Sequence, residues 1–144
     1  MVNFDLSGKI ALVTGGAHGI GFTLGCALAE YGVTLCFNCS SKGSYERGVA
    51  AYEKAGVQAH GFVCDVSDET AVNSMVEQIS TEVGVINILV NNAGIIKRKP
   101  MLEQTAADFR QVVDVDLTAP FIVAKAVIPG MIRIGGGRSS IFVP

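Results

Sequence analysis

The sequence contains no tryptophan, two histidines and four cysteines, and only 17% of its residues are charged. Its net charge of −2 at neutral pH provides no basic surface for nucleic acid or an anionic membrane. Asp5 and Lys9 interrupt the amino-terminal apolar positions, so no signal peptide is expected, and no unbroken apolar run of about 18 residues is present to span a bilayer. We therefore expect a cytoplasmic protein whose partners are neither nucleic acids nor membranes.

The few cysteines and histidines do not predict a metal site. Cys36 and Cys39 have the C-x-x-C spacing of some zinc and redox sites. Both fall on an expected strand, however, where residues three apart point to opposite faces. His18 and His60 form no cluster with other ligands. We therefore expect no bound metal.

Hydrophobic residues make up 49% of the 144 residues, which is enough for one domain with a core. Short apolar runs alternate with segments that carry apolar residues at helical spacing. Strands are predicted at 9–14, 33–38, 58–64 and 86–90, and helices at 19–31, 45–55, 68–83 (with Ser67 as N-cap) and 105–134, the last bent near Pro120 and Pro129. Strands separated by helices are parallel, which predicts an α/β fold with a doubly wound, Rossmann-like sheet.

Glycines are concentrated between the first predicted strand and the first predicted helix, in the segment Thr14-Gly-Gly-Ala-His-Gly-Ile-Gly. Glycine lets the backbone turn sharply and approach a pyrophosphate, and the helix N-terminus offers free N–H groups to it. A tight turn without a ligand would also use glycines, but this position favours a nucleotide site. The candidate cofactor residues are Gly15, His18, Gly19, Ile20 and Gly21.

Two further motifs follow later strands: Asp65-Val66 after the third, and Asn91-Asn92-Ala93-Gly94 after the fourth. Together with the glycine loop, these motifs resemble those of the short-chain dehydrogenase/reductase family, over residues 3 to about 134. The resemblance implies a strand order of 3-2-1-4 and an NAD(P) cofactor whose pyrophosphate lies on the backbone of residues 15–21.

The same resemblance assigns roles to the two later motifs. Asp65 would accept a hydrogen bond from the adenine amino group, and Val66 would pack nearby. Asn91, Asn92, Ala93 and Gly94 would lie along the nicotinamide ribose. The alternatives are that Asp65 is only a strand-end cap and that the two asparagines, without the glycine loop, simply form a turn.

The end of the second strand predicts which nicotinamide cofactor is bound. A carboxylate there would accept from the ribose 2′-OH and repel a 2′-phosphate. The segment Asn38-Cys39-Ser40-Ser41-Lys42 contains no carboxylate, and none follows until Glu46. Ser40 can donate to a phosphate, so NADP is favoured and NAD is the alternative. Residues 40–43 could also be no more than a solvated turn.

A basic segment, Lys97-Arg98-Lys99, follows the asparagine motif and is therefore expected near the nicotinamide. Arg98 would suit the carboxylate of a sugar acid, although a solvated basic loop is the alternative. The stretch 90–132 most resembles gluconate 5-dehydrogenases. We expect a hydride transfer between NADP(H) and a sugar acid such as gluconate. A 3-oxoacyl-carrier reductase and a non-catalytic nucleotide-binding module are the alternatives, and the family implies a homo-oligomer for a full-length chain.

Groups that the resemblance leads one to expect for catalysis are missing. The family carries a catalytic Ser at the end of a fifth strand and a Tyr-x-x-x-Lys pair after it, and neither is found in the sequence. Asp116 stands where the family usually has an Asn, and an ionised carboxylate accepts hydrogen bonds but cannot donate them. We therefore predict residues 1–144 to be an incomplete domain without turnover.

The segment 135–144 departs from the family pattern. Synonymous codons can be chosen for it such that a one-base shift reads GKIINICSM, which resembles the expected fifth strand with its Ser, so a frameshift is one explanation. Its glycines cost backbone entropy, and Pro144 cannot donate to a ladder. We therefore expect the fourth strand to keep an unpaired apolar edge.

Overall fold

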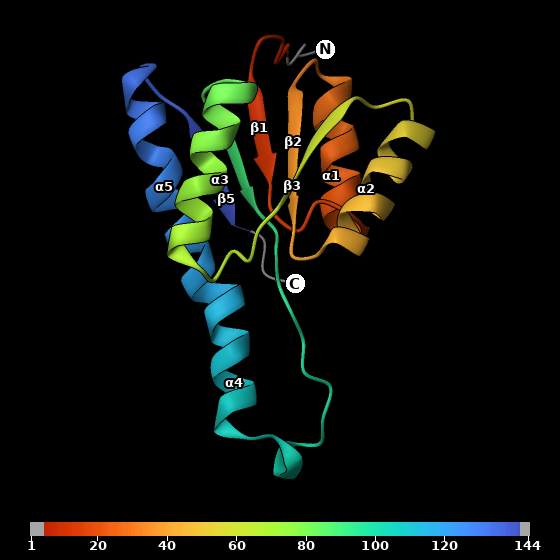
Figure 1. Ribbon diagram of the computed structural model, residues 1–144, viewed down its shortest axis with the longest axis vertical. Helices are drawn as coiled ribbons and strands as arrows, with labels where there is room; N and C mark the ends of the chain where they lie inside the picture. Colours follow the sequence, from red (N-terminus) through yellow and green to blue (C-terminus); the bar gives the residue numbers. More distant parts are fainter. Residues whose placement is uncertain (1–4, 142–144) are drawn as a thin grey trace.

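The computed structural model describes residues 5–141 as a five-stranded parallel sheet with helices on both faces (Figure 1). The elements in chain order are β1 (Ile10–Val13), α1 (Gly19–Glu30), β2 (Thr34–Cys39), α2 (Lys42–Lys54), β3 (Ala59–Val63), α3 (Glu69–Glu82), β4 (Ile88–Asn91), the 3-10 turn η1 (Met101–Glu103), α4 (Ala106–Val113), the π-helical turn η2 (Asp114–Thr118), α5 (Ala119–Arg133) and β5 (Arg138–Ile141). The prediction of a doubly wound, Rossmann-like α/β fold is confirmed.

The strand order is β3-β2-β1-β4-β5, so the predicted order 3-2-1-4 is confirmed and extended by one strand. In the centre, Ala11 of β1 is paired with Leu35 of β2 on one side and with Ile88 of β4 on the other. Every pairing is parallel, so the carboxyl ends of all strands meet at one edge of the sheet. From β1 the chain adds β2 and β3 on one side of the sheet and then β4 and β5 on the other. Open α/β sheets bind ligands at this point, where the order of strands switches sides.

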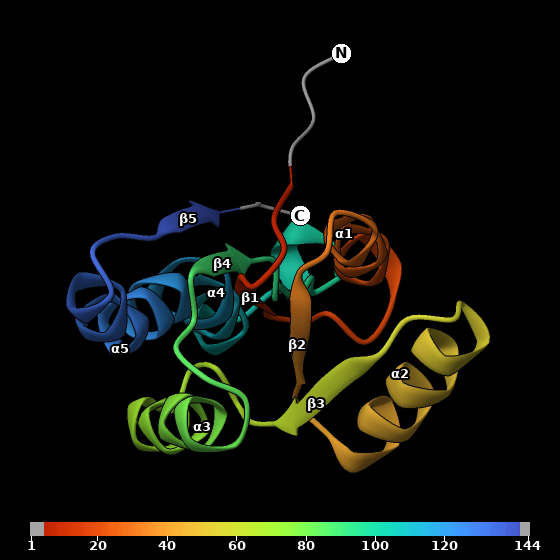
Figure 2. The same cartoon turned by 90° about the horizontal axis from the view of Figure 1, so that it is seen from above.

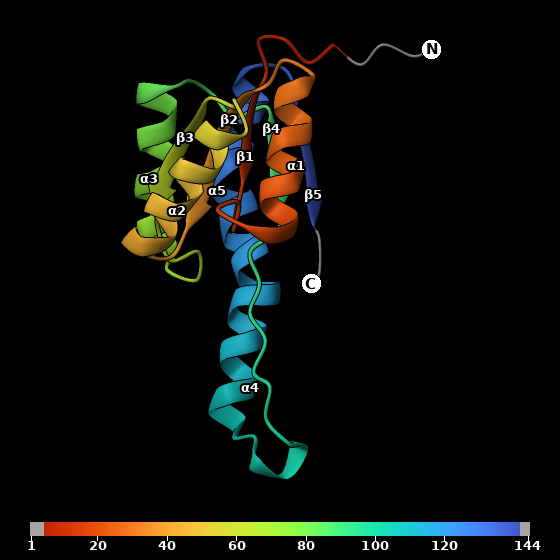
Figure 3. The same ribbon diagram turned by 90° about the vertical axis from the view of Figure 1, so that its right-hand side faces the viewer.

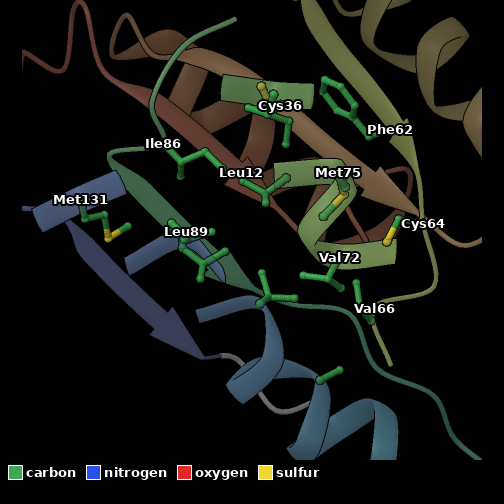
Figure 4. Close-up of a cluster of buried hydrophobic side chains, with 14 residues drawn as sticks. Leu12, Cys36, Phe62, Cys64, Val66, Val72, Met75, Ile86, Leu89 and Met131 are labelled. Atoms are coloured by element: carbon green, nitrogen blue, oxygen red, sulfur yellow. The ribbon is translucent and has the colours of Figure 1, made fainter. Parts of the chain in front are cut away.

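The helices separate into two layers, as the view from above shows (Figure 2). α1 and α2 cover one face of the sheet, and α3 and α5 cover the other. The expectation for the cysteine pair is confirmed, because Cys36 faces the α3/α5 layer while Cys39 faces the α1/α2 layer. Figure 4 shows the hydrophobic core between the sheet and the α3/α5 layer, which includes Leu12 of β1, Leu89 of β4 and Val72 of α3. Burying each such aliphatic side chain contributes about 1.5–3 kcal/mol.

Local hydrogen bonds correct two predicted helix starts. α2 begins at Lys42 rather than at residue 45, because the Ser41 hydroxyl accepts from the Ser44 N–H and caps the helix there. The N-cap of α3 is Asp68, whose carboxylate accepts from the Ala71 N–H, and not Ser67 as predicted. Ser67 and Asp68 are both good capping residues, so residue type alone does not show which of them caps α3.

The expected unpaired edge on β4 is wrong. β5 pairs with β4 in parallel, and the Arg138 N–H donates to the Asn87 carbonyl at 2.9 Å. Gly135 and Gly136 take positive φ angles of 84° and 139°, which turns the chain from α5 back onto the sheet. A backbone ladder needs no particular side chains, so residues with no apolar alternation still form this strand. Pro144 lies outside the described residues.

α4, η2 and α5 form one continuous helix that projects past the carboxyl edge of the sheet (Figures 1 and 3). The π turn η2 ends two residues before Pro120, the predicted position of a bend, which has no N–H to donate. The helix is long and apolar enough to cross a membrane, a property that the sequence analysis missed because Asp116 and Lys125 interrupt its apolar run. Here, however, Val123 and Val127 pack in the core. Phe121 of the same helix, by contrast, is 66% exposed.

Candidate functional site

A cleft of about 410 Å³ lies at the carboxyl edge of the sheet. The turns after β1, β2, β3 and β4 all contribute to its walls. The predicted cofactor residues that line it are Gly15, His18, Gly19, Ile20, Ser40, Asp65, Val66, Asn92, Ala93 and Gly94. The structure therefore brings together three motifs that are widely separated in the sequence. Gly21 and Asn91 lie outside this lining, as does Arg98.

The amino end of α1 opens into this cleft without a side-chain cap. His18 is the N-cap residue, and its side chain makes no capping hydrogen bond. The N–H groups of a first helical turn have no partner inside the helix, and they carry the positive end of the helix dipole. An anionic group in the cleft would satisfy them.

Hydrogen bonds from two neighbouring strand ends hold the glycine loop in place. The Asn38 side chain accepts from the Gly15 N–H at 3.4 Å, and the Asn38 carbonyl accepts from the Gly16 N–H at 3.0 Å. The Asn92 amide donates to the carbonyls of Thr14 and Gly15 at 3.0 and 3.2 Å. The loop is thus fixed before any ligand arrives, which lowers the entropy cost of binding.

Gly21 acts beneath this loop rather than in the cleft. A Cβ atom at Gly21 would lie 2.5 Å from the Gly15 carbonyl oxygen and would also collide with the Asn92 amide nitrogen. Only glycine lets α1 approach the loop this closely. The prediction that Gly21 belongs to the nucleotide loop therefore has a packing basis.

Thr14 and Asn38 are site residues that the sequence analysis did not single out. The Thr14 hydroxyl accepts from the N–H groups of Asn92 and Ala93, both at 3.0 Å, and so ties the end of β1 to the turn after β4. Asn38 also donates to the Cys64 carbonyl at 2.9 Å, which links β2 to β3. Buried polar residues at two strand ends were the available signal, because such groups need specific partners.

Asn91 is 2% exposed and lies behind the cleft, beside Ala119 and Val123. Within residues 5–141, its amide oxygen and nitrogen have no hydrogen-bond partner. Asn92, Ala93 and Gly94 are the members of this motif that reach the cleft.

The opposite end of the cleft is formed by the turns after β2 and β3. Asp65 accepts from the Ser67 N–H and hydroxyl at 2.9 and 2.7 Å through one carboxylate oxygen, which corresponds to the strand-end cap considered above. Asp65 still lines the cleft, so the cap and a ligand contact are compatible. Burial raises the pKa of the Cys64 thiol to about 11 and also raises the pKa of Cys39. Both cysteines therefore present neutral thiols to the cleft.

The basic segment after β4 lies outside the cleft lining and is paired with α4. Lys99 and Lys97 pair with the Asp108 carboxylate at 2.8 and 3.7 Å, whereas Arg98 between them is exposed and makes no salt bridge within the described residues. Asp116 accepts from the Ile95 N–H at 2.9 Å and so fixes the start of this segment. Gln111 of α4 and Val115 of η2 also line the cleft, which the sequence analysis did not anticipate.

Known proteins of similar sequence and structure include dehydrogenases of sugar acids. The chain is 47% identical over 136 residues to a 2-dehydro-3-deoxy-D-gluconate 5-dehydrogenase of Formosa agariphila, covering 94% of this chain and 52% of that protein. It is 39% identical to a gluconate 5-dehydrogenase of Gluconobacter oxydans, with 94% and 53% covered. The crystal structure of 2-keto-3-deoxy-D-gluconate dehydrogenase from Streptococcus agalactiae superposes with a TM-score of 0.86 at 59% identity, covering 95% of this chain and 52% of that one.

The chain thus spans about half the length of the curated relatives it matches. The family model described as short chain dehydrogenase matches residues 9–141, which includes the glycine loop, both later motifs and β5. On this match, and on a cleft that the three motifs line together, the chain belongs to the short-chain dehydrogenase family.

Proposed function

We propose that this chain binds NADP(H) and forms the cofactor-binding part of a dehydrogenase that acts on a six-carbon sugar acid. The observation that carries this proposal is the cleft itself. The uncapped end of α1, the fixed glycine loop and the turns after three further strands all face it. No other described feature of the chain combines free backbone donors with a fixed Gly-rich turn in this way.

The residues present fit a dinucleotide. Glycine at 15 and 21 lets the loop pack closely on the turn after β4 and on α1, because a Cβ atom at either position would collide with Ala93 or Asn92. The uncapped end of α1 then offers its N–H groups to a pyrophosphate. Asp65 keeps a second carboxylate oxygen for the adenine amino group, and Val66 provides an apolar wall. Asn92, Ala93 and Gly94 are left for the nicotinamide ribose. When bound, the cofactor supplies hydride transfer to and from carbon.

Preference for NADP rests on the turn after β2. Ser40 and Ser44 line this corner of the cleft, and the Arg47 guanidinium donates to the Ser44 hydroxyl at 3.1 Å. Asp65 is the only carboxylate among the residues that line the cleft. Nothing at the end of β2 therefore repels a 2′-phosphate, and hydroxyls and a guanidinium are available to bind it.

The names of the relatives support a sugar acid as substrate, with 2-keto-3-deoxygluconate first and gluconate second. Oxidation would pass a hydride from a carbinol carbon to the cofactor and its hydroxyl proton to a base. Arg98, exposed and without a carboxylate partner in the described residues, is the proposed contact for the substrate carboxylate. Because the sequence contains no Tyr-x-x-x-Lys, we expect no turnover from these 144 residues alone.

A 3-oxoacyl-carrier reductase is the second candidate, because such enzymes of Vibrio harveyi and Aquifex aeolicus are 34% and 38% identical to the chain. This alternative changes the substrate and leaves the proposed cofactor site unchanged. Binding of the cofactor is therefore the first property to measure.

Calorimetric titration of the purified chain with NADPH and NADH tests the proposal. We expect NADPH to bind more tightly, and Cys39→Asp to reverse the order, because a carboxylate at the end of β2 repels the 2′-phosphate. Cys39→Ser is the matched control, since it changes the thiol without adding charge. A folded chain that binds neither nucleotide would refute the cofactor site, and an equal effect of both substitutions would refute the charge argument.

A further inference from the structure

Tyr52 reaches the glycine loop from the interior of the protein. It lies on α2, is 1% exposed, and is not part of the cleft lining. Its hydroxyl nevertheless donates to the carbonyl oxygen of Gly16 at 2.8 Å, across a sequence separation of 36 residues. This is a direct link between the second helix and the loop on which the proposed pyrophosphate site depends.

The surrounding core is shaped around this side chain. The Tyr52 ring packs against Phe22 and Phe37, with ring centroids 4.8 and 5.1 Å apart. On α1, a Cβ atom at Gly25 would collide with the Tyr52 hydroxyl oxygen, so glycine at that position gives the hydroxyl its path. Burial raises the pKa of the Tyr52 hydroxyl well above its usual value, so the group remains a donor.

The hydrogen bond fixes the orientation of one peptide group in the loop. In a planar trans peptide, the C=O and the N–H that follows it point in opposite directions. With the Gly16 C=O held towards the core by Tyr52, the N–H of Ala17 faces away from the core, and Ala17 lines the cleft. Within residues 5–141 this N–H donates to no other group of the chain.

We propose that Tyr52 is a positioning residue for the nucleotide site. By holding the Gly16 carbonyl, it turns the Ala17 N–H towards the pyrophosphate. Asn38 restrains the same residue from the other side, because its carbonyl accepts from the Gly16 N–H. This inference rests on the proposed function, since it names a residue that acts through the glycine loop on the same ligand.

Tyr52→Phe and Tyr45→Phe form a matched pair for testing it. Both remove one hydroxyl from an aromatic residue of α2 that packs on Phe37, but the Tyr45 hydroxyl makes no hydrogen bond within the described residues. Binding of NADP⁺, which has a pyrophosphate, is compared with binding of adenosine 2′-monophosphate, which has none. We expect Tyr52→Phe to weaken NADP⁺ binding about fivefold and to leave the monophosphate unchanged. Tyr45→Phe should alter neither.

Equal weakening of both ligands would reduce Tyr52 to a general structural role, and unchanged NADP⁺ binding would also overturn the inference. Amide exchange at Gly16, whose N–H donates to the Asn38 carbonyl, is measured by NMR without ligand and separates this failure from failure of the proposed function. Faster exchange in Tyr52→Phe but not in Tyr45→Phe supports the positioning role even where the parent chain binds no nucleotide. Unchanged exchange in both variants contradicts it.

Discussion

The amino ends of α1 and of the three helices that follow it are built differently. α2 is capped by Ser41, α3 by Asp68, and α4 by Thr105 together with Asp108 in a capping box. α1 has His18 at the corresponding position and no side-chain cap. A side-chain cap contributes about 1 kcal/mol to helix stability, so α1 gives up a stabilising contact that its neighbours have.

This difference leaves the first N–H groups of α1 available to the proposed ligand. A capping oxygen on α1 would occupy the same N–H groups that an anion would bind. The missing contact is offset elsewhere, because Asn38 and Asn92 hold the preceding loop with several hydrogen bonds. The chain thus keeps the loop ordered while its helix end stays open.

Gly21→Ala should break this arrangement most severely. The added Cβ would lie 2.5 Å from the Gly15 carbonyl oxygen, and the loop would have to move. We expect NADPH affinity to fall more than about a hundredfold and the free energy of unfolding to fall by about 1–3 kcal/mol, as in other overpacked sites. Fluorescence titration and urea unfolding measure the two effects.

Gly43→Ala, in the first turn of the capped helix α2, is the control. A Cβ there meets only the Arg47 guanidinium, at 3.5 Å. Replacing this helical glycine with alanine should raise the free energy of unfolding by about 0.5–1 kcal/mol and leave NADPH affinity unchanged. Parent-like affinity in Gly21→Ala would show that the close packing at Gly21 is not required.

The pattern of apolar residues and glycines in the sequence predicted β1 to β4, the ends of α1 and α2 and most of the cleft lining. Buried apolar runs located β1 and β4, and the predicted helix ends at 31 and 55 lie within one residue of the observed ends of α1 and α2. The cleft lining was predictable because parallel strands bring their carboxyl ends to one edge. Whether each motif residue contacts cofactor stays a prediction.

The sequence pattern could not predict the contacts of single side chains or the backbone pairing of β5 with β4. Asn38 looks like an ordinary polar residue at a strand end until its three partners are seen. β5 carries Arg138, Ser139 and Ser140, which show no strand-like apolar alternation, and it forms through backbone pairing with β4. Adjacent capping residues such as Ser67 and Asp68 are resolved only by hydrogen-bond geometry.

His18→Asp should make α1 resemble its neighbours, with a moderate effect. A carboxylate at the N-cap would accept from the open N–H groups and favour the helix dipole, adding about 0.5–1 kcal/mol to the free energy of unfolding. The same charge would compete with a pyrophosphate, so we expect NADPH affinity to fall about tenfold. Thermal melting and calorimetry on one preparation measure both changes.

Asp68→Ala provides the opposite case on α3. It removes the carboxylate that caps Ala71, and should lower stability by about 1 kcal/mol without changing NADPH binding. If His18→Asp bound the nucleotide as tightly as the parent chain, the open end of α1 would not be the anion site.

The smallest effect concerns the capped end of α4 and its response to acid. Lys99 donates to the Asp108 carboxylate at 2.8 Å, and the N–H and hydroxyl of Thr105 also donate to it, which holds the pKa of that carboxyl well below its usual value of 3.8. A group whose pKa is lower in the folded state stabilises the fold fully above its unfolded pKa, and this contribution is lost as the pH falls from there towards the lowered value.

The first turn of α4 should therefore open more readily in acid, while the first turn of α1, which has no carboxylate cap, should not. We expect hydrogen-exchange protection of residues 106–109, corrected for intrinsic rates, to fall less than about fivefold between about pH 5 and about pH 2.5, because the pair is exposed and screened by solvent. Asp108→Asn keeps the shape of the side chain but cannot titrate, so its protection should not change over this interval. The same loss of protection in the Asn variant would show that another group, and not Asp108, makes the end of α4 sensitive to acid.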